Sequence, residues 1–178
     1  MGLDLGGIAK GYAADRCASL LHDHHISSAI LDLGGNVMAV GRNEGGNAWK
    51  VGIRHPLHFD QLLGYVEAED AAVVTSSGSE RWFLDRRGRK WHHILDPRTG
   101  CPAESDLLSI TVIGPSSCIC DGLATALFVM GIEAENLLLR QFPGYQIVAL
   151  DTSQKITISK ALEPAFHGVK TLSSTTCI

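Results

Sequence analysis

Three absences bound the class of this protein. No apolar run approaches the roughly twenty residues that a membrane-spanning helix requires, so we expect no membrane span. The formal net charge of −4 leaves no basic footprint for nucleic acid. The first residues run into LDLGGIAKG without the apolar stretch of a secretory leader. These absences favour a globular protein whose partners are neither membranes nor nucleic acids.

The five cysteines also lack a pattern, because they form no framework of regularly spaced pairs. An odd number without such spacing predicts free thiols and a reducing compartment, so we expect a cytoplasmic protein. Cys118 and Cys120 stand two residues apart in an expected helix and face different sides, which suits burial as small apolar groups. A zinc hydrolase built on the cysteines with His92 and His93 is disfavoured, because the spacings fit no zinc pattern.

What is present indicates one folded domain over residues 1–178. Hydrophobic residues make up 45% of the chain, enough for a sizeable core. Strand and helix signals do not alternate as repeated βαβ units, so the sequence predicts an α+β fold and not a doubly wound parallel sheet. The expected strands are 28–33, 37–40, 49–53, 63–68, 71–75, 81–84, 90–94, 107–113, 145–150 and 155–159.

Some of these expectations concern the surroundings of a segment. The run SAILDL at 28–33 is apolar enough to predict a buried strand. Strand 49–53 is expected to return beside strand 37–40 as a hairpin. We expect His55 and His58, in the loop between two strands, to lie on the surface. The tail from residue 169 is polar and is expected to fray.

The stretch SSCICDGLATALFVMG, residues 116–131, predicts a helix buried on most sides. Ser116 is placed to cap its start and Gly131 to end it. Asp121 and Thr125 interrupt the apolar pattern four residues apart, so they lie on one face, one turn from each other. Their hard oxygen atoms suit Mg²⁺. The alternative is an acidic residue favoured by the helix dipole, with Thr125 bonding back to the preceding turn; this stretch alone favours the alternative.

Gly6 and Gly7 lead into an expected helix at 8–22 that carries Lys10 in its first turn. Free backbone N–H groups and a cation at a helix start suit a phosphate group. The pattern is neither a Walker A loop nor GxGxxG, and a tight turn with a solvated lysine is the commoner arrangement. The stretch therefore leaves both interpretations open.

The stretch HHILDPRTG places two histidines at the end of an expected strand, just before a strong turn signal. Strand alternation sends His92 and His93 to opposite faces, so at most one of them points inward. An imidazole held at such a position suits acid–base chemistry, although a lone histidine is more often structural. The hydroxyl-rich segment TSSGS at 75–79 suits either a ligand site or an ordinary turn.

Taken together, these stretches resemble the ApbE family, the FAD:protein FMN transferases. The resemblance covers most of the chain, to about residue 150. The matching stretches are DLGGIAKGYAAD at 4–15, LDLGGN at 31–36, TSSGSERWF at 75–83, HHILDPRTGCP at 92–102 and DGLATALFVMG at 121–131. The resemblance implies an ApbE-like fold of mixed and antiparallel sheets packed with helices. Family members carry a substantial segment before DLGGIAKG, so this chain is expected to correspond to the C-terminal part of a full-length member.

The resemblance also implies a reaction, in which FAD and Mg²⁺ serve to move FMN onto a threonine or serine hydroxyl of a target flavoprotein. The product is a phosphoester and AMP leaves. The resemblance implies that Mg²⁺ is held by side-chain oxygens of Asp121 and Thr125 and by main-chain atoms of Gly7 and Ala124. It implies that FAD is contacted by Asp4, Lys10 and Leu95. It also implies that His93 is the acid–base residue. Two alternatives stay open: an FAD pyrophosphatase, and a flavin-binding module without catalysis.

Overall fold

The computed structural model describes residues 4–79, 81–169 and 175–177. Its helices are α1 (Ala9–Asp23), α2 (Ser117–Met130) and α3 (Glu135–Gln141). Its strands are β1 (Ser28–Asp32), β2 (Asn36–Gly41), β3 (Trp49–Arg54), β4 (Leu62–Ala68), β5 (Ala71–Ser77), β6 (Trp82–Leu84), β7 (Lys90–His92), β8 (Leu107–Gly114), β9 (Gln146–Asp151), β10 (Ile156–Ile158), β11 (Phe166–Gly168) and β12 (Thr175–Cys177).

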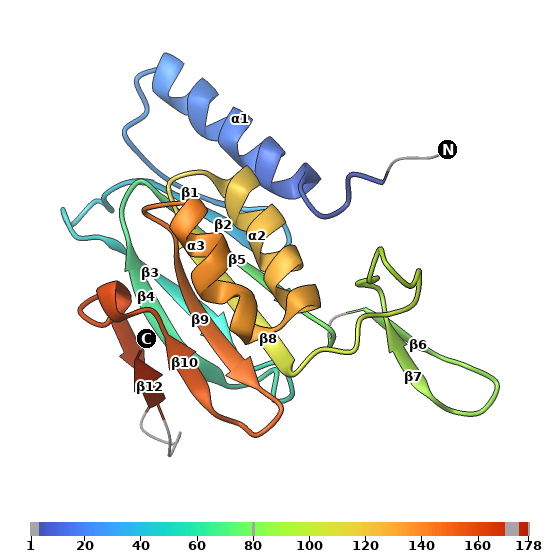
Figure 1. The fold of residues 1–178 in the computed structure, drawn as a ribbon. Helices are drawn as coiled ribbons and strands as arrows, with labels where there is room; N and C mark the ends of the chain where they lie inside the picture. Colours follow the sequence, from blue (N-terminus) through green and yellow to red (C-terminus); the bar gives the residue numbers. More distant parts are fainter. Residues whose placement is uncertain (1–3, 80, 170–174, 178) are drawn as a thin grey trace.

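A seven-stranded sheet in the order β1-β2-β5-β8-β9-β10-β12 forms the centre of the structure. Its neighbouring strands are antiparallel except for the pair β10 and β12. The three helices lie on one face of this sheet (Figure 1). This arrangement of helices on a largely antiparallel sheet confirms the predicted α+β class.

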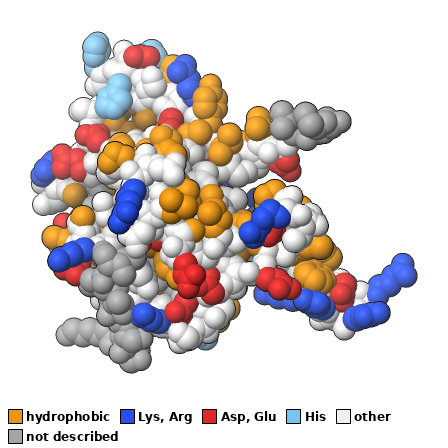
Figure 2. Space-filling model, viewed as in Figure 1, with side chains coloured by type: hydrophobic (Ala, Val, Ile, Leu, Met, Phe, Trp, Pro, Cys, Tyr) orange, Lys and Arg blue, Asp and Glu red, His pale blue; other side chains and the backbone are white. Residues whose placement is uncertain are grey.

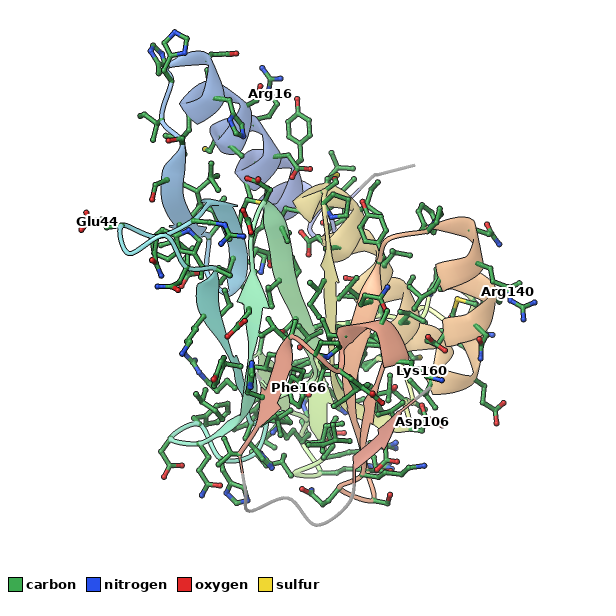
Figure 3. The ribbon with its side chains drawn as sticks, turned by 90° about the vertical axis from the view of Figure 1, so that its left-hand side faces the viewer. Arg16, Glu44, Asp106, Arg140, Lys160 and Phe166 are labelled. Carbon is green, nitrogen blue, oxygen red and sulfur yellow. The ribbon has the colours of Figure 1, made fainter. Side chains whose placement is uncertain are left out.

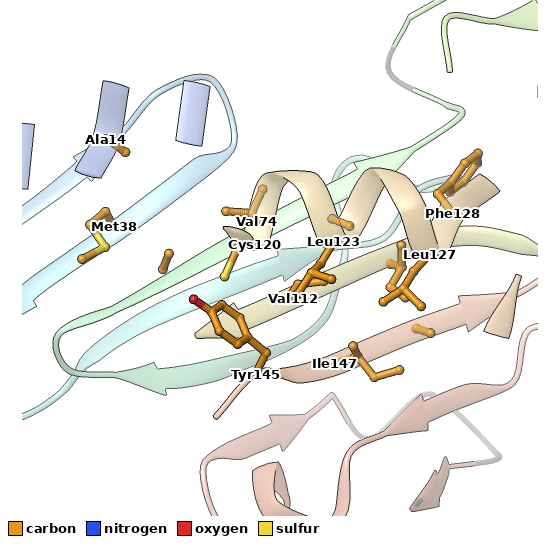
Figure 4. Close-up of a cluster of buried hydrophobic side chains, with 14 of the residues drawn as sticks. Ala14, Met38, Val74, Val112, Cys120, Leu123, Leu127, Phe128, Tyr145 and Ile147 are labelled. Carbon is orange, nitrogen blue, oxygen red and sulfur yellow. The ribbon is translucent and has the colours of Figure 1, made fainter. Parts of the chain in front are cut away.

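Two apolar cores lie on the two faces of the seven-stranded sheet. The helix-side core contains side chains of α1, α2 and alternate positions of β2, β5 and β8, among them Ala14, Met38, Leu123 and Phe128 (Figure 4). The second core joins the opposite face to a small sheet in the order β11-β4-β3. Arg16 of α1 and Arg140 of α3 point away from these cores into solvent (Figure 3). The sheet is therefore covered on both faces, as its mostly apolar central strands require.

Helix α2 begins and ends as its sequence predicts. The Ser116 side chain accepts a hydrogen bond from the Ile119 amide at 3.3 Å, which satisfies one of the free N–H groups of the first turn. Gly131 follows the last turn with φ at 84°, a conformation that favours glycine. Both ends of the helix that carries Asp121 and Thr125 are thus fixed by local chemistry.

The strands β6 and β7 form a separate two-stranded hairpin that projects from the body (Figure 1). Its tip carries exposed Lys and Arg side chains beside exposed apolar ones (Figure 2). Trp82, Phe83 and Leu84 are all more than half exposed. The hairpin positions HHILDPRTG, because His92 ends β7 and His93 follows it.

Three expectations about the surroundings of strands are wrong. β1 is not buried, because it is an edge strand whose residues alternate between exposed and half-buried. β3 pairs with β4 in the second sheet and not with β2. His55 is 4% exposed, whereas His58 is exposed as expected. In each case the local pattern identified the segment, and its contacts with other segments decided its pairing or its burial.

The C-terminal tail also departs from the expectation of fraying. Residues Thr175–Cys177 form β12 and pair in parallel with β10. The Val169 amide donates to the Leu63 carbonyl oxygen at 3.1 Å. The rest of that expectation falls on residues 170–174 and 178, which lie outside the described part of the chain. In the part that the structure describes, no helix combines the length and the hydropathy needed to cross a membrane.

Candidate functional site

Helices α1 and α2 cap each other's first turns through one aspartate apiece. Asp15 of α1 accepts hydrogen bonds from the Ser117 amide at 2.7 Å, the Cys118 amide at 3.0 Å and the Ser116 hydroxyl at 2.7 Å. These donors lie at the start of α2, where backbone N–H groups have no partner within the helix. Asp15 therefore fixes the position of α2 relative to α1.

Asp121 of α2 performs the reciprocal task for α1. Its carboxylate oxygen Oδ2 accepts a hydrogen bond from the Gly11 amide at 3.0 Å, in the first turn of α1. Asp121 is 5% exposed, so this bond compensates part of the cost of burying a charge. The second oxygen, Oδ1, has no hydrogen-bond partner among the described residues. Asp121 thus keeps one oxygen atom available for a ligand.

The close approach of the two helices depends on Gly11. A Cβ atom at this position would lie 2.3 Å from the Ser117 carbonyl oxygen, far inside van der Waals contact. Because the obstructing atom is backbone, a side chain at Gly11 would force the helices apart. The glycine therefore permits the reciprocal capping.

Thr125 and Gly7 stand beside Asp121. The Thr125 hydroxyl donates to the Asp121 carbonyl oxygen at 3.1 Å, which is the back-bonding that the structural alternative predicted. A hydroxyl has further acceptor capacity, and Oγ1 also lies 3.4 Å from the Ser76 hydroxyl. A Cβ atom on Gly7 would lie 3.6 Å from Thr125 Oγ1, so the Gly7 backbone borders this hydroxyl. Ala124 is fully buried in the helix-side core, which leaves only its main chain for the predicted role.

The oxygen atoms of Gly7, Asp121 and Thr125 fit a hard cation better than a soft one. Within residues 4–79, 81–169 and 175–177, no group of three or more His, Cys, Asp or Glu side chains could hold a metal. A cation at Asp121 would therefore rest on one carboxylate with hydroxyl and carbonyl oxygens. Mg²⁺ accepts such a set, because it commonly keeps several waters and takes one or two carboxylates.

Lys10 lies in the first turn of α1, close to a second glycine pair. Its ammonium group donates to the Gly34 carbonyl oxygen at 3.4 Å. Gly34 and Gly35 have φ values of 65° and 91°, and the Gly35 amide donates to Asp32 at 2.8 Å. This turn ends β1 and leads into β2, so Lys10 connects the start of α1 to the sheet.

Asp4 is exposed and accepts a hydrogen bond from the Gly6 amide at 2.7 Å, which shapes the turn before α1. The turn brings Gly7 against Thr125. The structure therefore gathers Gly7, Lys10, Asp121 and Thr125 around the start of α1. Asp4 precedes this group in the chain.

His92 and His93 differ in exposure, which agrees with the prediction that at most one of them points inward. The His92 ring is half-buried and packs edge-on against the Phe128 ring, with the two ring centroids 5.5 Å apart. Its Nε2 lies 3.0 Å from the Ala103 carbonyl oxygen. His93 is exposed, and its Nδ1 lies 3.3 Å from the Arg81 carbonyl oxygen. His92 therefore has a packing role, whereas His93 faces solvent.

The turn after His93 is locked by an ion pair. Arg98 Nε donates to Asp96 Oδ1 at 3.0 Å and to Oδ2 at 3.2 Å, and Nη2 donates to Oδ2 at 2.7 Å. These hydrogen bonds hold the pKa of the Asp96 carboxyl below its usual value. Leu95 stands between His93 and this pair and is 54% exposed. His93 and Leu95 thus lie beside a hydrogen-bonded turn at the base of the hairpin, on a different element from Asp121.

A cavity of about 320 Å³ lies on the His92 side of the same hairpin. Its lining includes Gly78, Lys90, His92, Ala103 and Phe128. His93 is not among its lining residues. The cavity is therefore distinct from the group at the start of α1.

Two residues with defined contacts or burial were not predicted from the sequence. Asp15 lies inside the matching stretch 4–15, but its capping role depends on a helix a hundred residues later. Asn36 ends the matching stretch 31–36 and is fully buried. A polar residue after a glycine turn and before an apolar strand was the available signal at Asn36.

The sequence profile described as the ApbE family matches residues 1–149 of this chain. The chain belongs to the ApbE family. The matched residues include both glycine pairs, the HHILDPRTG turn and helix α2. The predicted resemblance is confirmed.

Named ApbE relatives agree with this assignment. An FAD:protein FMN transferase of Treponema pallidum is 42% identical over 171 residues, covering 91% of this chain and 47% of the relative. One of Klebsiella pneumoniae is 39% identical, covering 89% of this chain and 48% of the relative. Among solved structures, the ApbE protein of Thermotoga maritima matches with a TM-score of 0.83 at 32% identity, covering 93% of this chain and 53% of that one.

The flavin transferase ApbE of Vibrio cholerae matches with a TM-score of 0.77 at 29% identity, covering 92% of this chain and 52% of that one. These structural matches confirm the ApbE-like fold predicted from the sequence. The chain spans about half the length of the relatives it matches.

Proposed function

We propose that this ApbE chain binds FAD together with Mg²⁺ and transfers FMN to a threonine or serine hydroxyl of a target flavoprotein. The observation that carries the proposal is the buried Asp121 carboxylate. One of its oxygens is held by Gly11 at the start of α1, and the carboxylate lies one turn from Thr125, whose hydroxyl borders Gly7. The names of the relatives, FAD:protein FMN transferase, support the same activity.

Asp121 and Thr125 would hold Mg²⁺ through side-chain oxygens, and Gly7 and Ala124 through main-chain atoms. When bound, the cation neutralises charge on the phosphates of FAD. The Gly11 hydrogen bond keeps the Asp121 carboxylate oriented before any cation arrives. Because the carboxylate is already oriented, less free energy is spent on ordering it when a cation binds.

Lys10 and the start of α1 would receive the pyrophosphate of FAD. The first turn of a helix presents free N–H groups and a partial positive charge, and Lys10 adds a full charge there. Asp4 and Leu95 would contact other parts of FAD. The exposed apolar side chain of Leu95 offers a surface for a ring system, and Asp4 is held by the Gly6 amide.

His93 would act as the base during transfer. If its Nδ1 carries the proton and donates to the Arg81 carbonyl oxygen, Nε2 is free to accept one. The acceptor hydroxyl oxygen then bonds to the phosphorus of the FMN half while His93 takes its proton. The bond from that phosphorus to the bridging oxygen breaks, and AMP leaves with the bridging oxygen. Positioning and charge neutralisation supply most of the catalysis in reactions of this kind.

Two other activities fit the same site. Water in place of the acceptor hydroxyl would give an FAD pyrophosphatase, and the exposure of His93 to solvent favours access of water. A flavin-binding module without turnover is the second alternative, because the chain spans about half of its relatives.

One experiment separates these three activities. The chain is incubated with FAD, Mg²⁺ and a peptide carrying an acceptor threonine, and the products are read by intact mass and chromatography. A matched peptide with valine in place of the threonine is the control. Transfer predicts an FMN adduct on the threonine peptide alone, with one AMP released per adduct. Free FMN and AMP with either peptide would indicate a pyrophosphatase, and unchanged FAD would contradict both enzymatic proposals.

We also propose that the protein works in a reducing compartment such as the cytoplasm. Cys17, Cys101, Cys118 and Cys120 are free thiols. Burial raises the pKa of the Cys120 thiol above its ordinary range, so this group is a packed apolar side chain and not a reactive thiolate. Fractionation of cells that express the tagged protein tests this location, and recovery outside the cytoplasm would contradict it.

A further inference from the structure

The side chain of Asn36 is buried without a hydrogen-bond partner among the described residues. It is fully buried, and neither its amide nitrogen nor its amide oxygen has a hydrogen-bond partner in the part of the chain that the structure describes. Burying an amide without partners destabilises a fold. Native proteins rarely keep such a group, and a ligand that the group binds is one explanation.

Asn36 faces the helices. Met38 and Val40 of β2 belong to the helix-side core together with Ala14 of α1, whereas Ala39 belongs to the opposite core. Alternate residues of a strand point to the same face. The Asn36 side chain therefore points from the start of β2 toward the helix layer (Figure 4 shows the neighbouring Met38).

The pairing of β2 with β5 brings Asn36 beneath the proposed cation site. Asn36 lies opposite Val74, and Ser76 is the next residue of β5 on the same face. The Ser76 hydroxyl lies 3.4 Å from the Thr125 hydroxyl. Diagonal neighbours of this kind lie about 7–8 Å apart, within reach of long side chains. Asn36 is thus next to the strand position that contacts Thr125.

The turn before Asn36 is the one that Lys10 contacts. The Asn36 carbonyl oxygen accepts from the Leu33 amide at 3.0 Å and closes the turn, and the Gly34 carbonyl oxygen accepts from Lys10. A Cβ atom on Gly34 or Gly35 would meet nothing within 4 Å, so the turn borders open space. Asn36 therefore lies below an open glycine turn that already holds a cationic side chain.

We propose that Asn36 is a further binding residue for FAD and its cation, with its amide nitrogen donating to a phosphate oxygen and its amide oxygen accepting from a cation-bound water. This inference rests on the proposed function. A phosphate alone satisfies only the nitrogen and a cation alone only the oxygen, whereas a hydrated cation–phosphate pair satisfies both. Because the amide is covered, contact requires a local shift. Lys10, held on Gly34 by a long hydrogen bond of 3.4 Å, is able to move toward the phosphate and permit it.

Ser117 provides a matched control. Its hydroxyl is also fully buried and without a partner among the described residues, but it lies where α2 packs against Gly11 and not beneath Thr125. If the two unpaired groups are only structural defects, substitutions at Asn36 and at Ser117 should have the same effect on FAD affinity. If Asn36 binds the ligand, only its substitution should weaken FAD binding.

The test compares Asn36→Leu, Asn36→Ala and Ser117→Ala with the wild type. Thermal unfolding is measured without ligands, and FAD is titrated by calorimetry in Mg²⁺. We expect both Asn36 variants to bind FAD about tenfold more weakly or worse. At least one should unfold at or above the wild-type temperature, because an unpaired buried amide has been removed. Ser117→Ala should leave FAD affinity unchanged.

Wild-type FAD affinity in both Asn36 variants overturns the inference and leaves the proposed function standing. Unfolding of both variants well below the wild type means that the amide has a protein partner in solution, which also overturns it. A wild-type chain that binds no FAD removes the proposed function and this inference with it.

Discussion

At the scale of single residues, Asp121 has one observed contact and one proposed task, which use different oxygen atoms. Oδ2 caps α1 through Gly11, and Oδ1 is the oxygen proposed for the cation. Asp15 has only the capping task, and both of its oxygens accept hydrogen bonds from the start of α2. Substituting each aspartate in turn therefore separates helix capping from the proposed cation binding.

We expect Asp121→Asn to bind Mg²⁺ more weakly, on the order of 10–100-fold or more, because losing a carboxylate ligand costs at least as much as losing a neighbour of one. The amide oxygen of asparagine still accepts from Gly11, so the fold should persist. Asp15→Asn should do the reverse, lowering stability by about 0.5–2 kcal/mol through a weakened cap and leaving Mg²⁺ affinity intact. Calorimetry and urea unfolding measure the two effects. Equal Mg²⁺ affinity in both variants would remove Asp121 from the cation site.

The proposal assigns the base to His93, whereas His92 has a packing contact with Phe128. His93→Ala should lower the transfer rate by roughly 10²–10⁴-fold, the usual contribution of a general base, with FAD and Mg²⁺ affinities nearly unchanged. His92→Ala should lower stability by loss of its contact with Phe128 and leave the rate at saturating FAD close to wild type. Single-turnover transfer across pH is the measurement. The assignment of the base to His93 fails if the His92 variant loses transfer and the His93 variant keeps it.

His55 makes stability depend on pH. Its Nδ1 accepts from the Leu57 and His58 amides at 3.1 and 3.2 Å, which requires an unprotonated nitrogen. Burial, and then the neighbouring His58, lowers the pKa of His55 below its ordinary value of about 6.5. The unfolded chain therefore binds this proton more readily than the folded one. The stabilisation is complete above about pH 6.5 and is lost as the pH falls through the lowered pKa.

The variant His55→Asn isolates this effect, because an asparagine oxygen can accept from the same amides but does not titrate. Urea unfolding between pH 7.5 and the acid limit of solubility should show a smaller loss of stability in the variant than in the wild type. Parallel curves for the two proteins would show that His55 does not carry the dependence.

At the scale of elements, the crossing of α1 and α2 holds the site together. Each helix caps the other, and Gly11 lets their backbones approach. The element types were predictable: the periodicity and caps of both helices come from residues close in sequence, and so do most strands. Asp121 and Thr125 were predictable as a pair for the same reason.

The partners of the elements were not predictable. β1 reads as a buried strand, yet it is an edge because only β2 pairs with it. β3 follows β2 after a short turn, yet pairs with β4 in another sheet. The cap from Asp15 to Ser117 and the Gly11 bond to Asp121 join residues about a hundred positions apart. Local patterns contain no information on contacts of that range.

Gly11→Ala tests the crossing. Its Cβ would lie 2.3 Å from a backbone oxygen, so the helices must separate, and we expect a loss of about 1–3 kcal/mol or more from overpacking. Gly122→Ala is the matched control on α2. There a Cβ would lie 3.4 Å from Ile8, an ordinary contact, and helix propensity predicts a gain of up to about 1 kcal/mol. Urea unfolding measures both. A Gly11 variant as stable as the Gly122 variant would show that the crossing tolerates a side chain.

At the scale of the whole molecule, the sheet joins two groups of proposed site residues. The start of α1 and the middle of α2 carry Lys10, Asp121 and Thr125 on the helix-covered face. The hairpin of β6 and β7 projects from the body (Figure 1). His93 and Leu95 follow β7, just before the turn in which Arg98 pairs with Asp96. The sequence predicted the members of both groups by family resemblance. The relative position of the two groups depends on the fold. Asn36 was identified as a candidate only because the structure buries it.

The central proposal is that the group at the start of α1 binds the phosphates of FAD together with Mg²⁺. Calorimetric titration of FAD and of riboflavin, each with Mg²⁺ and with chelator, tests this claim in the wild type and in Lys10→Ala. Riboflavin has no phosphate, so Mg²⁺ and Lys10 should affect only FAD. We predict that Mg²⁺ strengthens FAD binding, that Lys10→Ala weakens it by about tenfold or more, and that riboflavin responds to neither. Equal responses of the two ligands, or FAD affinity that is the same with Mg²⁺ and chelator, would contradict the account.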